Sequence, residues 1–194
     1  AARSRLRAAI EQHSGATTIS FGEQLWPALI RDSYAAYYTT LARVRPDALR
    51  IPLADIIARI DAAPLADAAT RTSLLPCARV LNESLADATT EPFDISYWIG
   101  PLAGCDGLDT ESLNCVIADA LARDIAEAVA AHDSPIKSAL WVISAGRKPT
   151  AIAVETGRGT PEDQRGALSD YMAFGQMVGS GPPLFRSREL LALI

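Results

Sequence analysis

The sequence predicts an α+β protein, in which a helical N-terminal half is followed by a small, mainly antiparallel or mixed sheet packed against long helices. Apolar residues first recur at three- and four-residue steps, then alternate with polar residues, and two short apolar runs later flank a turn. We therefore expect a helical segment over 1–90 and a strand-helix-hairpin-helix segment over 91–194. A chain of 194 residues is compatible with one compact domain that contains both segments.

The first segment is expected to open with a short helix over 4–13, which ends before Gly15. Residues 17–21 are expected to be briefly extended. A longer amphipathic helix then runs to Pro46. Its apolar stripe consists of Trp26, Leu29, Ile30, Tyr34, Tyr37, Leu41 and Val44.

Prolines mark the starts of the next helices, because a proline in the first turn costs no hydrogen bond. Pro52 opens a helix whose stripe is Leu53, Ile56, Ile57 and Ile60. Pro64 and Pro76 precede two further expected helices. The first segment is therefore expected to be a bundle of four or five short helices.

The hydrophobic period changes after residue 91. Alternation over 93–99 predicts a half-buried strand. Asp109 is then expected to cap the longest helix, over 110–131. The stripe of this helix consists of Leu113, Val116, Ile117, Ala120, Leu121, Ile125 and Val129.

Two apolar segments, 139–144 and 150–155, flank the short sequence Gly-Arg-Lys-Pro at 146–149. This connection predicts a hairpin of two antiparallel strands. In an alternative α/β arrangement, 93–99 and 139–144 are parallel neighbours joined by the long helix. A mixed sheet would satisfy both patterns.

The C-terminal part is expected to contain two helices. Thr160 and Pro161 have the residue types of an N-cap and a first helical position, and this helix is expected to run to about Val178. Residues 179–183 form a spacer rich in Gly and Pro. A final apolar helix is expected over 187–194.

Charge is sorted along the chain. Residues 1–50 carry seven Arg against four acidic residues, a net charge of +3. Residues 51–135 carry four Arg against fourteen acidic residues, a net charge of −10. Residues 136–194 carry seven basic against five acidic residues, a net charge of +2. This pattern predicts surfaces that attract each other, or an anion held at one end.

The candidate anion-binding residues are Gly157, Arg158, Gly159 and Thr160, between an expected strand and an expected helix start. Glycines let the backbone approach an anion, and a helix start presents unpaired N–H groups. The spacing does not match a P-loop. The alternative is a strand-to-helix turn that needs glycine for its dihedral angles.

The candidate interaction residues lie at the two ends of the chain. Arg3, Arg5 and Arg7 could contact an acidic surface or nucleic acid. The tail residues Leu190, Leu191 and Leu193 could insert into a groove on a partner, or pack on the core of their own chain.

No catalytic set, metal centre or cofactor site is predicted. The three cysteines are irregularly spaced, and the two histidines provide no base for a nucleophilic Cys105. We expect buried free thiols in a reducing compartment such as the cytoplasm, with a Cys105–Cys115 disulfide as the alternative. No apolar run reaches the ~20 residues that cross a bilayer. The chain does not begin with Met, so we expect it to be processed or part of a longer polypeptide.

Three functions follow from these patterns. The first is a non-catalytic assembly protein that associates with itself or with a protein partner through its basic ends and acidic middle. The second is an enzyme or binding module for a phosphorylated small molecule, with the loop around Arg158 as its site. The third is a nucleic-acid-associated protein, which the isoelectric point near 5.0 disfavours.

Overall fold

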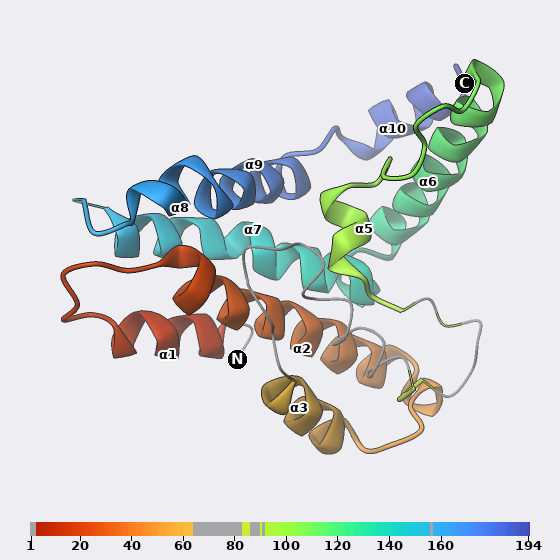
Figure 1. Cartoon of the computed structure of the whole chain (residues 1–194). Coiled ribbons are helices and arrows are strands. Elements are labelled where there is room, and N and C mark those ends of the chain that lie inside the picture. Colours follow the sequence, from red (N-terminus) through yellow and green to blue (C-terminus); the bar gives the residue numbers. More distant parts are fainter. Residues whose placement is uncertain (1–2, 64–82, 86–89, 91, 156) are drawn as a thin grey trace.

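The computed structural model describes most of the chain, over residues 3–63, 83–85, 90, 92–155 and 157–194. Within these residues the protein is helical and contains no β-strand, so the prediction of an α+β fold with a sheet is wrong (Figure 1). Among the described residues, β-type pairing is limited to two isolated bridges, Ile19 with Gly159 and Leu49 with Leu85. The chain therefore folds as a helical protein.

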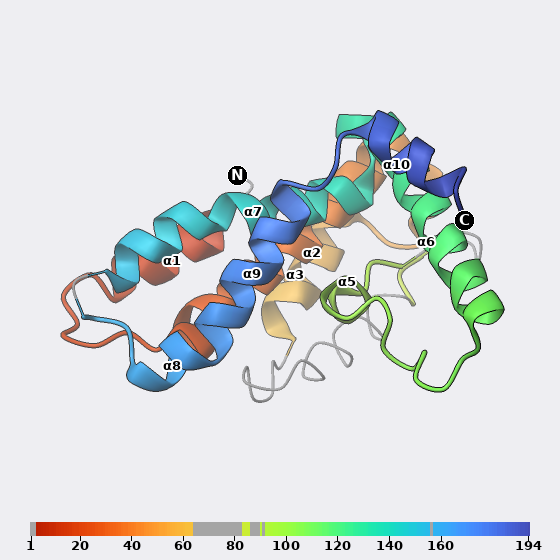
Figure 2. The same cartoon turned by 90° about the horizontal axis from the view of Figure 1, so that it is seen from above.

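Two long helices form the centre of the body. Helix α2 (Trp26–Val44) packs along α7 (Pro135–Val154). Helix α1 (Ser4–Gln12) lies on α2 and α7, and α9 (Ala167–Gly179) lies on α7 (Figures 1 and 2). Helix α3 (Leu53–Ala62) packs on α2. The shorter connecting elements are η1 (Phe21–Leu25), η2 (Pro46–Ala48), α5 (Ile95–Ile99), η4 (Ala131–Asp133) and α8 (Pro161–Arg165).

The predicted hairpin is a continuous helix, because the residues interpreted as its turn lie inside α7. Gly146 is needed there for close packing: a Cβ at this position would lie 2.5 Å from Leu29 Cδ2 and 2.8 Å from Tyr171 Oη. The glycine therefore allows α2 and α9 to approach α7. Pro149 also lies within the helix. Sequence reasoning treated both residues as turn signals because it had no information about these neighbours.

The predicted strand over 93–99 is also wrong. Asp94 accepts a hydrogen bond from the N–H of Ser96 at 2.9 Å and caps the five-residue helix α5. Phe93 and Ile95 are buried, as the alternation required. Phe93, however, lies in a loop, and Ile95 is the first residue of a helix. A run of seven residues is too short for its period alone to separate strand from helix. With no strand here, the parallel and mixed-sheet alternatives are wrong as well.

Several predicted helix starts are confirmed. Asp109 accepts from the N–H of Ser112 at 2.8 Å and caps α6 (Thr110–Ala130). Thr160 accepts from the N–H of Asp163 at 3.1 Å and caps α8. The helix expected after Pro52 is α3, while those expected after Pro64 and Pro76 lie outside the described residues.

Two C-terminal boundaries differ from the prediction. The helix expected over 160–178 is divided at Gly166, which ends α8 and precedes α9. The N–H of Gly166 donates to the carbonyls of Glu162 and Asp163, at 2.9 and 3.2 Å, and so closes the last turn of α8. The final helix, α10 (Leu184–Leu191), begins directly after Pro183 rather than at residue 187.

Aromatic side chains fill the core along α2. Near its start, Phe21 stacks on Tyr171 with ring centroids 5.0 Å apart, and Trp26 lies against both rings. Farther along, Phe93 stacks on Tyr37 with centroids 5.7 Å apart. These contacts join α2 to α9 and to the segment before α5, because each ring comes from a different part of the chain.

Helices α6 and α10 form an arm that extends from the body (Figures 1 and 2). Helix α6 packs mainly on α10 and makes few contacts with α7. None of its 21 residues is fully buried; the residues of its predicted apolar stripe are partly buried, apart from Val129, which is exposed. Among the described residues, no helix combines the length and the hydrophobicity needed to span a membrane.

Candidate functional site

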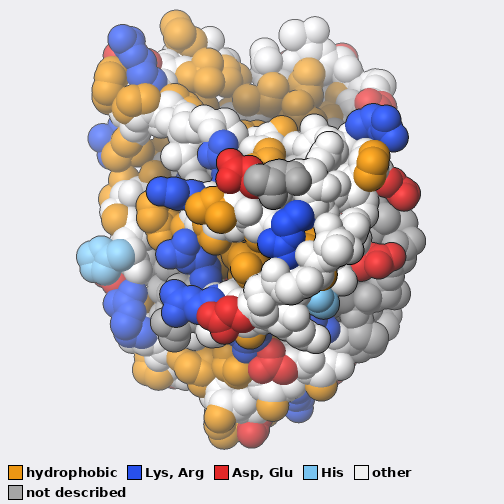
Figure 3. Space-filling model, turned by 90° about the vertical axis from the view of Figure 1, so that its left-hand side faces the viewer, with side chains coloured by type: hydrophobic (Ala, Val, Ile, Leu, Met, Phe, Trp, Pro, Cys, Tyr) orange, Lys and Arg blue, Asp and Glu red, His pale blue; other side chains and the backbone are white. Residues whose placement is uncertain are grey.

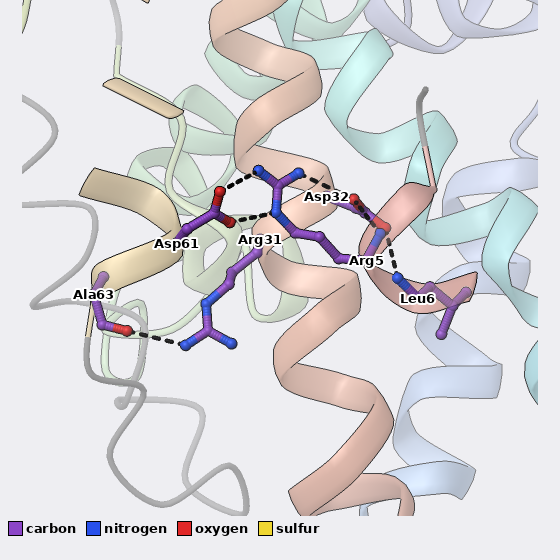
Figure 4. Close-up of polar contacts among 6 residues, drawn as sticks. All are labelled: Arg5, Leu6, Arg31, Asp32, Asp61 and Ala63. Atoms are coloured by element: carbon purple, nitrogen blue, oxygen red, sulfur yellow. Dashed lines mark hydrogen bonds and ion pairs between the residues drawn. The ribbon is translucent and has the colours of Figure 1, made fainter. Parts of the chain in front are cut away.

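Arg5 connects three helices of the body (Figure 4). Its Nε and Nη2 donate to the two carboxylate oxygens of Asp61 on α3, and its Nη1 donates to Asp32 on α2. Asp32 is only 2% exposed and also accepts from the backbone N–H groups of Arg5 and Leu6, at 3.2 and 2.9 Å. Those groups belong to the first turn of α1, which has no side-chain cap of its own. Asp32 therefore caps α1 from a neighbouring helix.

The other two N-terminal arginines lie elsewhere. Arg3 donates from Nη1 to the carbonyl oxygen of Ala145 on α7 at 2.8 Å. Arg7 is exposed on α1. The structure thus directs Arg3, Arg5 and Arg7 to three separate environments, and their contact with a partner stays a prediction.

The charge sorting is partly satisfied inside one chain. Each of three ion pairs joins a basic end of the sequence to the acidic middle: Arg5–Asp61, Arg43–Asp133 and Lys137–Asp124. Arg43 Nη1 lies 2.7 Å from Asp133 Oδ1, and its guanidinium lowers the pKa of that carboxyl. On the face shown in Figure 3, acidic side chains lie among and beside the basic ones. Attraction between the segments therefore acts within the fold.

The candidate anion residues surround a structural arginine. Arg158 Nη2 donates to the carbonyl oxygens of His13, Ser14 and Ala16, at 2.9, 2.9 and 3.1 Å. It thereby holds the loop that follows α1, and the N–H of Ile19 donates to the carbonyl of Arg158 at 2.7 Å. An added anion would compete with these carbonyls for the guanidinium. Binding of an anion at this loop stays a prediction.

The remaining residues of that loop shape a turn and cap a helix. Gly157 has a φ of +79°, a conformation that favours glycine, as the turn interpretation expected. Gly159 forms the bridge with Ile19. Thr160 donates from its hydroxyl to Asp163 Oδ2 at 2.6 Å. Asp163 also accepts from the N–H groups of Phe21 and Gly22, at 2.9 and 3.1 Å. The Asp163 carboxylate therefore accepts hydrogen bonds from the N–H groups at the start of η1.

The C-terminal tail packs on its own chain through α10, which lies against α6. Leu191 is half-buried, whereas Leu190 is 48% exposed and Leu193 is 84% exposed. Packing on the same chain is thus present, but it leaves these two leucines in solvent. Their insertion into a partner stays a prediction.

A groove of about 870 Å³ lies between α2 and α7, and residues of α1, α3, η4 and the end of α6 also line it. Small side chains of the two helices, including Ala35, Ala36, Thr39 and Ser138, form much of its lining. Small side chains leave room that larger ones would fill, and apolar grooves of this size commonly bind ligands or partner segments. We define these residues, with Trp141 and Val142, as the α2–α7 groove.

Trp141 is the largest apolar side chain of the lining, and it is 67% exposed. The charged residues of the lining are largely paired within the chain: Arg5 with Asp32, and Lys137 with Asp124. The groove is therefore a mostly apolar surface with compensated charges and one exposed indole.

Sequence reasoning missed Trp141 because it assigned 139–144 to a strand. In a helix of 3.6 residues per turn, Trp141, Lys148 and Ile152 lie on one face, opposite the buried Ala139, Ile143 and Thr150. All three residues on the first face are exposed. A helical interpretation of 135–154 would thus have identified a tryptophan outside the core.

The described residues provide no candidate metal centre, since no group of three or more His, Cys, Asp or Glu side chains among them is arranged to hold an ion. Cys105 and Cys115 are free thiols, but Cys105 is only half-buried and Cys115 is exposed, so the prediction that these thiols are buried is wrong. Cys77 lies outside the described residues. Comparisons of the chain with protein-family models, curated proteins and solved structures found no match. Any functional inference therefore depends on the geometry itself.

Proposed function

We propose that this chain is a non-catalytic interaction protein that forms a dimer with a second copy of itself through the α2–α7 groove. The observation that carries the proposal is the exposed Trp141 beside an apolar hollow of about 870 Å³. Large apolar patches on a protein surface commonly mark interaction sites, and tryptophan is enriched among the residues that dominate binding energy.

A second copy suits this groove because the same surface contains both a projecting ring and a hollow. In a two-fold dimer each copy presents the same patch, so a patch must complement itself. Trp141 of either copy can enter the hollow of the other, next to the small side chains Ala35 and Ala36. Two-fold dimers are also the commonest oligomers of soluble proteins.

Apolar contact, rather than attraction between the sorted charges, is expected to dominate this dimer. Arg5 and Lys137 at the groove already have carboxylate partners in their own chain. Burying charges that are already paired within one chain adds little net affinity to an interface. Burying the indole of Trp141 increases the affinity through the hydrophobic effect. The proposed association is therefore expected to be nearly independent of salt.

The test is the mass in solution by light scattering, at low salt and at ~1 M salt, where the Debye length is only ~3 Å. We expect a dimer in both conditions. Trp141→Ala should raise the dissociation constant of the dimer about thirtyfold. This corresponds to a loss of about 2 kcal/mol of binding free energy, as expected when a dominant interface residue is truncated. Ile152→Ala is the matched control, because Ile152 is exposed on the same helix face but does not line the groove.

Three outcomes would contradict the proposal. A wild-type monomer at high concentration would exclude self-association. A dimer unchanged by Trp141→Ala would place the interface elsewhere. A dimer that dissociates at ~1 M salt would indicate association through the sorted charges instead of the groove.

A further inference from the structure

A second hollow lies at the other end of the body and is lined by residues of η1, the start of α2, α5, α8 and α9. Its volume is about 470 Å³. No described residue lines both this cavity and the α2–α7 groove. A function of the cavity is therefore independent of the proposed dimer.

One side of the cavity is aromatic. Trp26, Tyr171 and Phe174 contribute to its lining, and the rings of Trp26 and Tyr171 lie 5.6 Å apart. The hydroxyl of Tyr171 donates to the carbonyl of Ile143 at 2.9 Å, inside the body. Burial raises the pKa of Tyr171, so its side chain remains a neutral phenol. The aromatic side thus consists of neutral rings, which carry partial negative charge on their faces.

The charged residues of the lining are all acidic. Among the described residues that line the cavity, Glu23, Glu162, Asp163 and Asp170 are carboxylates, and none is Lys, Arg or His. The hydrogen-bond donors to Asp163 are backbone N–H groups and the Thr160 hydroxyl, which are uncharged and leave its negative charge uncancelled. Glu23 and Glu162 are exposed, so a solute can reach them from water.

From this combination we infer that the cavity binds a monovalent organic cation, an ammonium or guanidinium group attached to a small apolar body. Aromatic faces attract such cations, and they do so more strongly when water is partly excluded. The carboxylates repel anions and favour a positive charge. An apolar body attached to the cation would cover ring surface that an inorganic ion leaves wet.

An inorganic metal ion fits the cavity less well. The described residues contain no group of three or more ligating side chains arranged around one point. Asp163 uses its carboxylate oxygens to cap η1 and to accept from Thr160. A metal ion would have to displace these contacts, whereas an organic cation can be held by longer-range attraction and by the rings.

The test measures thermal unfolding of the whole chain with choline and with its neutral isostere 3,3-dimethyl-1-butanol. Sodium chloride at the same ionic strength corrects for screening. We expect choline to raise the midpoint of unfolding in a saturable way, because a ligand specific to the native state stabilises it. The isostere, which has the same shape without the charge, should raise it much less.

Variants locate the site. Removing both exposed charges with Glu23→Gln and Glu162→Gln should weaken choline binding about tenfold, which corresponds to 1.4 kcal/mol. Glu11→Gln is the matched control, because Glu11 is exposed on α1 and does not line the cavity. Ala167→Leu places a larger side chain in the cavity lining. It should also reduce choline binding, because the leucine occupies space that the ligand needs and leaves the charge of the cavity unchanged.

A second arm separates two sources of the same chemistry. If Nα-acetyl-lysine amide, whose ε-ammonium is free, also stabilises the chain, the cavity accepts a cation that a lysine side chain of a peptide can present. Stabilisation by choline alone assigns a free small cation, and both results support the site. Equal stabilisation by choline and its isostere, no stabilisation by either cation, or choline binding unchanged in the double variant would overturn the inference.

Discussion

The guanidinium of Arg3 donates a hydrogen bond of 2.8 Å to the carbonyl oxygen of Ala145, on a helix that lies 142 positions later in the sequence. This carbonyl lies four residues before Pro149, which has no N–H with which to complete the helical hydrogen bond. Arg3 therefore supplies the donor that proline removes. The N-terminal segment and the proline-containing part of α7 depend on each other.

This relationship predicts a non-additive pair of substitutions. Arg3→Ala should lower the free energy of unfolding by about 1 kcal/mol, because an acceptor loses its partner. In a Pro149→Ala background the same change should cost much less, since the new N–H can reach Ala145. Urea unfolding of the four variants gives the coupling energy. Equal costs of Arg3→Ala in both backgrounds would show that the two residues act separately.

Asp32 should be among the most sensitive acidic positions for stability. Asp32→Asn keeps the size of the side chain but removes its negative charge. That charge accepts hydrogen bonds from the Arg5 guanidinium and from two backbone N–H groups. We expect a loss of about 2 kcal/mol, typical of charged hydrogen bonds, because Arg5 keeps its pair with Asp61. Asp119→Asn on the exposed surface of α6 is the control, with an expected change within about 0.5 kcal/mol. Similar losses in both variants would contradict the cap assigned to Asp32.

The contribution of Asp61 should depend on pH. Its hydrogen bonds with Arg5 lower the pKa of the Asp61 carboxyl in the folded chain. A carboxyl with a lowered folded pKa stabilises the fold above its unfolded pKa, about 3.9, and this stability is lost as the pH falls through the folded pKa.

We therefore expect the wild type to be more stable than Asp61→Asn at pH 7, by less than about 1 kcal/mol because the pair is partly exposed. The difference should shrink below about pH 4. Urea unfolding of both proteins across this pH range is the measurement. A difference that grows as the pH falls would reverse the assigned sign.

Ala131 is strained where α6 meets α7, with a φ of +52° that L residues with side chains rarely adopt. Ala131→Gly should therefore stabilise the chain, since such strain costs about 1–3 kcal/mol. The same change at Ala130, whose φ is −65°, should destabilise it by about 1 kcal/mol. Thermal unfolding compares the two, and a loss of stability in both would show that Ala131 is unstrained.

Predictions from the sequence were accurate where a residue acts on its near neighbours. The starts of α6 and α8 follow from the caps Asp109 and Thr160. In each case the side-chain oxygen of the cap accepts a hydrogen bond from the backbone N–H three residues later. The roles of Arg5 and Arg158 could not be predicted in this way. Their partners include Asp61 and His13, far away in sequence, and no local pattern identifies such contacts.

The candidate sites show the same limit. The α2–α7 groove beside Trp141 and the cavity beside Trp26 arise where helices distant in the chain pack, so the composition of a single segment could not indicate these two hollows. The charge sorting was visible in the sequence. Whether the charges would meet within one chain or between chains depended on the fold.

The sequence by itself determined the boundaries of α1 and α6 and the starts of α3 and α8, because capping and proline effects act within one helical turn. The tertiary structure decided that residues 139–154 lie in one helix rather than in a hairpin. Gly146 is required there by the side chains of Leu29 and Tyr171, and the break at Pro149 is offset by Arg3. A residue that favours a turn in isolation can remain in a helix when distant neighbours supply the packing and hydrogen bonds that it lacks.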